Sequence, residues 1–311
     1  MNANDRNAVE RVCVKDWLKA ANVAAGKAVR IWRLFYEVGP RCGRAIFLPI
    51  DQGFEHGPVD FLPNPPSGDP EFQLRLALEG NYSGIVFEPG LARKYHHAYA
   101  GRVPLVFKVN AKTNIPSDAD AFSPLTGSVE EGVAIGADAI GYTLYVGSPA
   151  QDRDIAQLAE VRRACDRFGM PLIVWSYPRG SAVKLKGTRD SLYAIDYAAR
   201  VACEMGADIV KLNMPKPDEE CPGQPEGYTR LNLDEFQRMA KVIRSAGRTL
   251  VLVSGGSKLS DANVLAKARL CFEAGAAGLI FGRNMWQRAM PDALDMTAKV
   301  HDLAHAFGDA P

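Results

Sequence analysis

The stretch GADIVKL, residues 206–212, sets the pattern that decides the fold of this chain. A glycine of the kind that ends helices leads into a short apolar strand, and the phrase recurs as GADAIGY at 136–142 and GAAGLIF at 275–281. Segments of this type are near-continuous in Ile, Val, Leu or Phe, as strands buried on both faces should be. Eight are present, at residues 44–51, 84–89, 105–110, 137–147, 171–180, 207–215, 249–256 and 277–282.

Amphipathic stretches with helical spacing separate most of these strands. Four of them, each ending on a glycine, are residues 152–169, 191–206, 233–247 and 260–275. The first places one apolar stripe on Ile155, Leu158, Val161 and Cys165. Eight strand–helix units predict an α/β fold, a (β/α)8 TIM barrel with its site at the C-terminal ends of the strands. The alternative, an open doubly wound sheet, would carry phosphate-binding glycines after its first strand, whereas here they follow the seventh and eighth.

Composition and charge restrict the class of protein. A length of 311 residues suits an α/β barrel with insertions, and 47% hydrophobic with 23% charged residues indicates a globular enzyme. The net charge of +1 gives no sign of a nucleic-acid or membrane partner, and no apolar run reaches the roughly 20 residues of a membrane span. The polar N-terminus has no signal-peptide core. Six scattered cysteines without a CxxC pair predict free thiols in a reducing cytoplasm.

Two parts of the chain differ in character. Residues 1–43 precede the first strand and predict an N-terminal helical extension, whereas residues 44–311 predict the barrel catalytic domain. Within the extension, residues 16–36 read as one or two helices with an apolar stripe. We expect this segment to cap the bottom of the barrel or to contact a neighbouring subunit.

Lys211 lies where the strand 207–215 leaves the core. Burying an unpaired ammonium costs several kcal/mol, so burial drives a lysine toward its neutral amine. A neutral amine attacks carbonyl carbon and forms a Schiff base. The alternative is a lysine whose stem is buried and whose ammonium reaches water.

Polar side chains lie at the ends of most of the predicted strands. They are Asp51 and His56 after the first, Lys108 and Asn110 at the third, Tyr142 and Tyr145 in the fourth, Trp175, Tyr177 and Arg179 in the fifth, and Lys211 and Asn213 in the sixth. Each has a structural alternative, such as packing for Trp175, a turn salt bridge for Arg179 or a satisfied core hydroxyl for Tyr142. Because the C-terminal strand ends of a barrel share one face, the set predicts a site there.

The last two strands end in loops that suit a phosphate. Ser254, Gly255 and Gly256 follow the seventh strand, and glycines let backbone N–H groups approach an anion closely. Gly282 and Arg283 open a helix after the eighth strand, where N–H groups and a guanidinium can add donors. Simple tight turns are the alternative. A catalytic zinc site is not indicated, because the five histidines lack ligand spacing.

These motifs resemble those of the archaeal-type class I fructose-1,6-bisphosphate aldolases, the DhnA-type barrel aldolases. The resemblance runs from residue 45 to 288 and rests on motifs in the order of that family. They are DQGFEHGP at 51–58, GYTLYVGS at 141–148, VWSYPRG at 174–180, ADIVK at 207–211, VSGGSK at 253–258 and FGRNMWQR at 281–288. It implies a metal-independent lyase without a cofactor, acting on a phosphorylated sugar in glycolysis or gluconeogenesis, in a homo-oligomer that is commonly a decamer in this family.

The resemblance also implies roles for individual residues. Lys211 would be the Schiff-base lysine, Tyr177 the general acid/base and Asp51 the carboxylate beside the reacting hydroxyls. Substrate-binding roles would fall to Trp175, His56, Arg179, Ser254, Gly255, Gly256, Gly282 and Arg283.

Three features differ from the family pattern and bear on the aldehyde that is preferred. Gln52 replaces a histidine, Asn213 replaces a second lysine, and the loop at 215–230 is longer. Three other functions therefore remain open. The first is a transaldolase-like 2-amino-3,7-dideoxy-heptulosonate synthase, the second a thiolase acting on a phosphorylated dione, and the third a non-catalytic sugar-phosphate-binding barrel.

Overall fold

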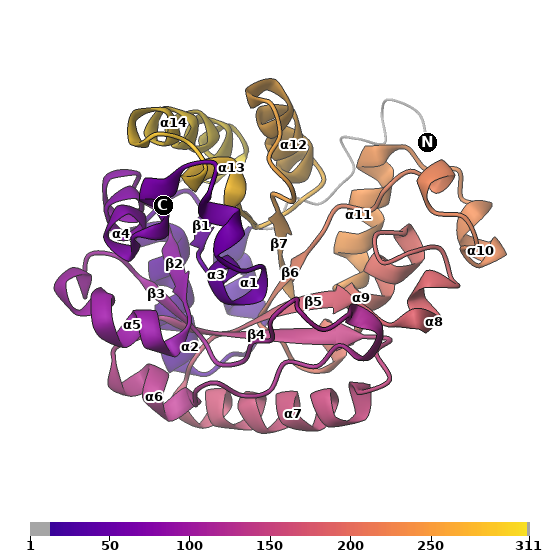
Figure 1. Cartoon of the computed structure of the whole chain (residues 1–311), viewed down its shortest axis with the longest axis horizontal. Coiled ribbons are helices and arrows are strands. Elements are labelled where there is room, and N and C mark those ends of the chain that lie inside the picture. Colours follow the sequence, from indigo (N-terminus) through magenta and orange to yellow (C-terminus); the bar gives the residue numbers. More distant parts are fainter. Residues whose placement is uncertain (1–12, 310–311) are drawn as a thin grey trace.

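A closed barrel of eight parallel strands, paired in chain order, forms the centre of the computed structural model, which describes residues 13–309 (Figure 1). Every predicted strand is confirmed, because each apolar run is buried by helices outside and by side chains inside the barrel. The strands are β1 (Ala45–Pro49), β2 (Gly84–Phe87), β3 (Leu105–Lys108), β4 (Ala139–Val146), β5 (Leu172–Pro178), β6 (Ile209–Leu212), β7 (Leu250–Ser254) and β8 (Gly278–Ile280).

Helices follow the strands along the outside of the barrel. In chain order these are α4 (Pro70–Glu79), α5 (Pro89–Tyr95), α6 (Val129–Ala134), α7 (Gln151–Phe168), α9 (Leu192–Glu204), α11 (Glu235–Ser245), α12 (Asp261–Glu273) and α14 (Met290–Phe307). The other helices are α1 (Val14–Ala20), α2 (Ala25–Trp32), α3 (Gln52–Glu55), α8 (Ser181–Lys184), α10 (Glu226–Thr229) and α13 (Arg283–Trp286). The four predicted helix-ending glycines all have positive φ, as a helix C-terminus requires: Gly169, Gly206, Gly247 and Gly275.

The expected apolar stripe of α7 is wrong at one position. Leu158, Val161 and Cys165 are buried, but Ile155 is 39% exposed. Asp154 takes the inward place in the first turn instead, where its carboxylate accepts hydrogen bonds from the Tyr142 hydroxyl at 2.6 Å and the Tyr145 N–H at 2.8 Å. A buried carboxylate satisfied by two donors displaces the apolar side chain from this face.

The aspartates of the repeated GAD phrase have a shared structural task at the N-terminal ends of the strands. Asp138 accepts from the Leu105 N–H at 3.0 Å, and Asp208 accepts from the Leu172 N–H at 2.8 Å. Each carboxylate thus satisfies the first N–H of the neighbouring strand, which the parallel ladder leaves open. The third repeat, GAAG, has no such carboxylate.

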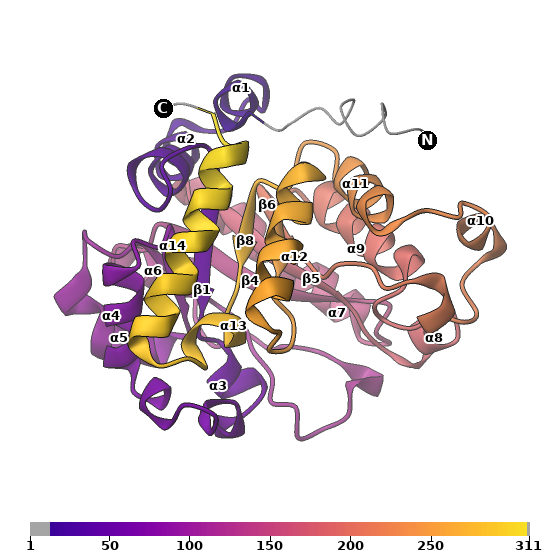
Figure 2. The same ribbon diagram turned by 90° about the horizontal axis from the view of Figure 1, so that it is seen from above.

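The helices before β1 close the bottom of the barrel, the end at which the strands begin. Figure 2 shows α1 and α2 at one end of the barrel and α3 at the other. Ile31, Leu34 and Phe35 are fully buried against side chains of the barrel interior. Lys27 is also buried and forms an ion pair with Asp208 at 2.9 Å. The segment therefore packs at the barrel bottom, which is one of the two places that we expected for it.

The division of the chain at residues 43 and 44 stays a prediction, and residues 1–12 of the expected extension lie outside the described residues. Within residues 13–309, no helix is both long and apolar enough to cross a membrane.

Candidate active site

The site forms at the end of the barrel opposite α1 and α2, where the strands end. Side chains alternate between the two faces of a strand, and this alternation decides which of them point into the barrel. On β6, Ile209 faces the barrel interior, so Lys211 two positions later faces it as well. The same alternation on β5 turns Ile173, Trp175 and Tyr177 inward. Lys211 and Trp175 are partners in the register of β5 and β6, which places the amine beside the indole.

The Lys211 amine lies buried beside two aromatic rings. Its Nζ is 5.2 Å from the centre of the Trp175 ring and 5.4 Å from that of Tyr177, and the residue is only 5% exposed. Burial lowers the pKa of Lys211 to about 8, against the opposing attraction of Asp51 and Glu55. The positive charges of Lys108 and Arg283 act in the same direction as burial. With this pKa roughly a tenth of the amine is neutral at pH 7, far more than for an ordinary exposed lysine.

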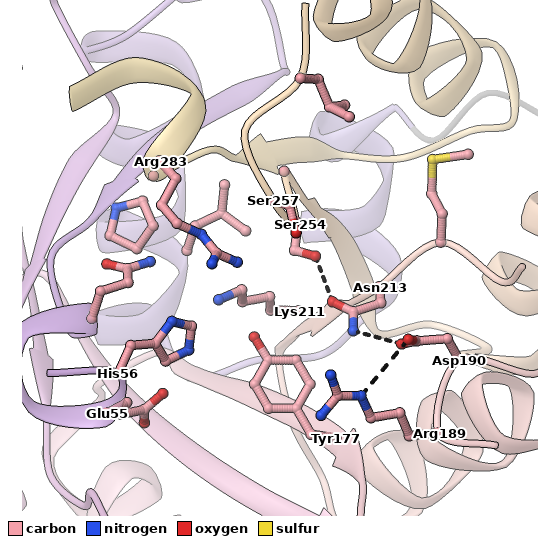
Figure 3. Close-up of a pocket in the computed structure, with 18 of the residues that line it drawn as sticks. Glu55, His56, Tyr177, Arg189, Asp190, Lys211, Asn213, Ser254, Ser257 and Arg283 are labelled. Atoms are coloured by element: carbon pink, nitrogen blue, oxygen red, sulfur yellow. Dashed lines mark hydrogen bonds and ion pairs between the residues drawn. The ribbon is translucent and has the colours of Figure 1, made fainter. Parts of the chain in front are cut away.

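The Tyr177 hydroxyl points into the same space as the Lys211 amine (Figure 3). Burial, with the negative charges of Asp51 and Glu55, raises the pKa of Tyr177 well above its usual range. The hydroxyl is thus held in its protonated form in the ligand-free protein and can donate a proton.

Trp175 lies beneath the pocket rather than in its wall. It is fully buried and its ring is close to two ammonium groups, 5.2 Å from Lys211 and 5.3 Å from Lys108. Only a glycine fits against it on β4, because a Cβ at Gly141 would lie 2.9 Å from the indole. Trp175 is not among the residues that line the pocket, and its expected role in substrate binding stays a prediction.

Asp51 follows β1 and is buried, 2% exposed, in the wall of the pocket. Its Oδ2 is 3.6 Å from the Lys108 ammonium and accepts no hydrogen bond from residues 13–309. Burial alone would raise the pKa of Asp51, but attraction by Lys108 and Lys211 outweighs it and lowers that pKa. The result is an ionised carboxylate in the pocket wall whose buried Oδ2 has no hydrogen-bond donor among these residues.

Lys108 is the centre of a charged cluster that sequence reasoning recognised only in part. Its fully buried Nζ donates to Glu55 at 2.6 Å and lies 3.7 Å from Glu88. Burial would lower the pKa of Lys108, but the three carboxylates raise it, so it stays charged. Burial raises the pKa of Glu88 to about 8. The sequence named Lys108 as a strand-end residue. Glu88 directly follows β2, so the same strand-end reasoning could have found it, whereas Glu55 lies in α3 and reaches Lys108 only because β1, β2 and β3 pair side by side.

His56 and Arg283 approach the pocket from opposite ends of the barrel sequence. Both contact Asp60: the His56 Nδ1 at 3.0 Å and the Arg283 Nη1 at 3.9 Å. Figure 3 shows both side chains on the same side of Lys211. The imidazole and the guanidinium therefore share one carboxylate at this rim of the pocket.

The loops after β7 and β8 meet as the glycine pattern predicts. Gly256 has φ +73°, and a Cβ at Gly255 would come within 2.9 Å of the Asn284 amide. Gly282 immediately precedes the four-residue helix α13, which begins at Arg283. Ser254 differs from expectation in one respect: its hydroxyl donates to Asn213 Oδ1 at 2.6 Å, so its proton faces that side chain. The loop therefore offers mainly backbone N–H groups.

Arg179 belongs to a second basic cluster, on the far side of Tyr177. Lys112 and Arg179 each lie 2.9 Å from the Asp118 carboxylate, and Arg189 lies 3.6 Å from it. Arg189 also lies 3.8 Å from the Asp190 carboxylate, so three cations face two carboxylates and leave one positive charge in excess in this part of the pocket wall. Figure 3 shows Arg189 and Arg283 on opposite sides of Lys211 and Tyr177. Lys112, Asp118 and Arg189 were missed by the sequence reasoning, because they lie in loops without a motif.

Two predicted strand-end residues prove to be structural. The Tyr142 hydroxyl donates to Asp154 inside the core, and Asn110 pairs with the backbone of Thr143, donating at 2.8 Å and accepting at 2.7 Å. A cavity of about 1000 Å³, large enough for a bisphosphorylated sugar, is lined by most of the other predicted strand-end residues: Asp51, His56, Tyr145, Tyr177, Arg179, Lys211 and Asn213. Within the described part of the chain, no group of three or more His, Cys, Asp or Glu side chains is placed to hold a metal ion.

Comparisons with known proteins agree with this geometry. The sequence profile of the DeoC/LacD family aldolases matches residues 45–288. A protein of Thermoproteus tenax named class 1 fructose-bisphosphate aldolase is 39% identical over 272 residues, 87% of this chain and 93% of that protein. One of the same name from Halobacterium salinarum is 36% identical over 253 residues, 81% of this chain and 88% of the relative.

Solved structures give the same result. An archaeal fructose-1,6-bisphosphate aldolase, solved with its catalytic lysine bound to the carbinolamine intermediate of the substrate, is 37% identical with a TM-score of 0.75, covering 88% of this chain and 99% of that one. A fructose-bisphosphate aldolase of Slackia heliotrinireducens is 28% identical with a TM-score of 0.80, covering 93% and 90%. Fold and site together define a TIM-barrel protein with a buried, inward-facing lysine at the C-terminal end of a strand. The chain belongs to the DeoC/LacD family of aldolases.

Proposed function

We propose that this chain is a class I fructose-1,6-bisphosphate aldolase, which reversibly cleaves its substrate to dihydroxyacetone phosphate and glyceraldehyde 3-phosphate through a Schiff base on Lys211. The observation that carries the proposal is the Lys211 amine, buried beside Trp175 and Tyr177 with a pKa of about 8. Relatives named class 1 fructose-bisphosphate aldolase, and a related enzyme solved with a lysine carbinolamine, support the same chemistry.

In the proposed reaction the neutral Lys211 amine adds to C2 of the open-chain ketose, and the carbinolamine takes up a proton from water and loses its hydroxyl as water to give a cationic iminium. The iminium accepts the electron pair of the C3–C4 bond while the C4 hydroxyl gives up its proton. Glyceraldehyde 3-phosphate leaves and an enamine remains. Protonation of the enamine at C3, followed by hydrolysis of the iminium, releases dihydroxyacetone phosphate and restores the amine.

Tyr177 and Asp51 are suited to different parts of this proton transfer. Tyr177 is protonated in the free protein, and the full positive charge of an iminium about 5 Å from its ring favours release of that proton to water, which leaves a tyrosinate that can take the C4 proton. The same hydroxyl can then return the proton to C3. Asp51, held ionised by Lys108, can accept hydrogen bonds from the substrate hydroxyls beside the reacting carbons.

The two basic regions of the pocket suit a substrate with a phosphate at each end. The loops after β7 and β8, with Arg283, would hold the 1-phosphate next to the carbonyl that Lys211 attacks. The cluster of Lys112, Arg179 and Arg189 on the other side of Tyr177 would hold the 6-phosphate. Binding energy from both phosphates would align the reacting carbons with the amine.

Arg283→Ala tests the placement of the 1-phosphate. Loss of one charge-assisted contact to a dianion, worth about 1.5–3 kcal/mol, should lower kcat/KM for fructose 1,6-bisphosphate roughly 10- to 100-fold. Steady-state cleavage assays measure this loss. Borohydride trapping of unphosphorylated dihydroxyacetone is the comparison, because that ketone has no phosphate for Arg283 to contact and shows only damage to the rest of the site. An equal loss in both assays would show that Arg283 supports the structure rather than the phosphate.

A panel of phosphorylated ketones, each trapped on the whole protein with borohydride and read by intact mass, tests the function itself. We expect a covalent adduct with fructose 1,6-bisphosphate and with dihydroxyacetone phosphate, and no change after treatment with EDTA. An adduct formed only with the substrates of the heptulosonate synthase or of the dione thiolase would assign one of those activities instead. No adduct with any ketone would indicate a binding protein, and activity lost to EDTA and restored by zinc would exclude this mechanism.

The remaining expectations about partners and location are part of the proposal. A homo-oligomer, a cytoplasmic location and the absence of nucleic-acid and membrane partners stay predictions from the sequence. Size-exclusion chromatography with light scattering on the purified chain checks the first of them.

A further inference from the structure

Lys267, on α12, reaches the loop after β7 from outside the barrel. Its Nζ donates to the Gly255 carbonyl at 3.2 Å, and a Cβ at Gly256 would lie 3.7 Å from the same nitrogen. No carboxylate forms an ion pair with this ammonium among residues 13–309, although Lys267 lines the same cavity as Lys211. Burial lowers the pKa of Lys267, against weaker attraction by Cys271, Glu235 and Asp190.

Asn284 holds the same loop from the other side. Its Nδ2 donates to the Gly255 carbonyl and to the Ser257 carbonyl, each at 3.2 Å, and its Oδ1 accepts from the Leu259 N–H at 2.8 Å. The Gly255 carbonyl therefore has two donors, one from α12 and one from α13. Both of its acceptor directions are used.

This arrangement fixes the direction of the next N–H group. The peptide bond between Gly255 and Gly256 is trans, so its C=O and N–H point in opposite directions. With the carbonyl held by Lys267 and Asn284, the Gly256 N–H points away from both. Within the part of the chain that the structure describes, it donates to no other residue. It is left for a ligand in the cavity.

We propose that Lys267 is a positioning residue of the phosphate-binding loop: it holds the Gly255 carbonyl so that the Gly256 N–H faces the bound phosphate, and its unpaired positive charge attracts that dianion. This inference rests on the proposed function, which places the 1-phosphate at this loop. Lys267 belongs to none of the sequence motifs. Only the packing of α12 against the loop brings its ammonium to the Gly255 carbonyl.

The test is binding of sn-glycerol 3-phosphate to the full-length protein by isothermal titration calorimetry. This ligand carries the phosphate but no carbonyl, so its binding does not depend on Schiff-base formation. Lys267→Met should weaken its affinity roughly tenfold, the size of one charge-assisted contact, whereas Lys267→Arg should recover affinity to within about threefold. The matched control is Arg269→Met, which removes an exposed cation from the same helix and should change nothing.

A second readout separates positioning from general damage to the site. Borohydride trapping of unphosphorylated dihydroxyacetone on Lys211 should proceed at an unchanged rate in Lys267→Met, and its thermal unfolding midpoint should not fall. Should Lys267→Met prove unstable, Lys267→Gln, which keeps a donor and removes the charge, is measured in its place and should lose part of the affinity.

Three outcomes overturn the inference: unchanged affinity in Lys267→Met, an equal loss in Arg269→Met, or slower trapping of dihydroxyacetone. Absence of glycerol 3-phosphate binding to the parent protein overturns it as well. If instead the parent binds glycerol 3-phosphate but forms no adduct with fructose 1,6-bisphosphate, the proposed function fails and the result for Lys267 still stands on the calorimetry.

Discussion

Lys211→Met is expected to abolish both the borohydride-dependent adduct and the cleavage of fructose 1,6-bisphosphate. Methionine has nearly the length of lysine but no amine, so the iminium that accepts the C3–C4 electron pair cannot form. Intact mass after borohydride and a coupled assay for glyceraldehyde 3-phosphate measure the two losses. Because an apolar side chain replaces a buried amine, the thermal unfolding midpoint should be at least that of the parent.

The pH dependence of trapping in the parent is the control for this prediction. Since the pKa of Lys211 is lowered to about 8, the neutral fraction of the amine should fall roughly tenfold for each pH unit below that value and level off above it. The initial rate of adduct formation should follow the same curve. An inflection near the ordinary lysine pKa, or an adduct that persists in Lys211→Met, would assign the Schiff base to another lysine.

Tyr177→Phe should lower cleavage by roughly 10²- to 10⁴-fold, the usual contribution of a positioned acid/base. Dihydroxyacetone phosphate should still be trapped on Lys211, because iminium formation with this ketone breaks no C–C bond and does not use the C4 proton transfer. Steady-state kinetics and trapping rates on the same preparation give both numbers.

Tyr145→Phe is the matched control, since Tyr145 lines the same cavity on β4 and is the register partner of Tyr177 on β5. Its hydroxyl interacts with Ser123 at 3.4 Å, and we expect only a small change in turnover. Near-normal cleavage by Tyr177→Phe, or a larger loss in Tyr145→Phe, would move the proton transfer to another group, with Asp51 next in line.

The strands and the larger helices could be predicted because their signals are local. A buried strand is a continuous apolar run, and a helix that ends in a left-handed turn needs glycine, as at Gly169 and Gly206. The one wrong stripe position, Ile155, failed because Asp154 found two hydrogen-bond donors in the core. The hydrophobic periodicity of α7 gives no sign of these donors, because both belong to β4.

The site likewise has residues whose position the sequence predicts and features that only the packing decides. Lys211 and Tyr177 lie near the C-terminal ends of their strands, and Asp51 and the glycine loops follow theirs, so strand position alone predicts that they share the C-terminal face. The depth at which each side chain lies is set by packing. Trp175 follows the same rule as Tyr177 but lies one inward-facing position lower on β5, and therefore supports Lys211 from beneath the cavity.

By itself, then, the sequence determined the barrel, the face that carries the chemistry and the lysine at its centre, because these depend on short-range order along the chain. Tertiary structure alone decided the electrostatics of that lysine. Glu55 and Glu88 reach Lys108 only after β1, β2 and β3 pair, and Lys267 reaches the Gly255 carbonyl only after α12 packs on its loop. A pKa depends on burial and on charges a few ångströms away, and in a closed barrel those charges come from strands far apart in the chain.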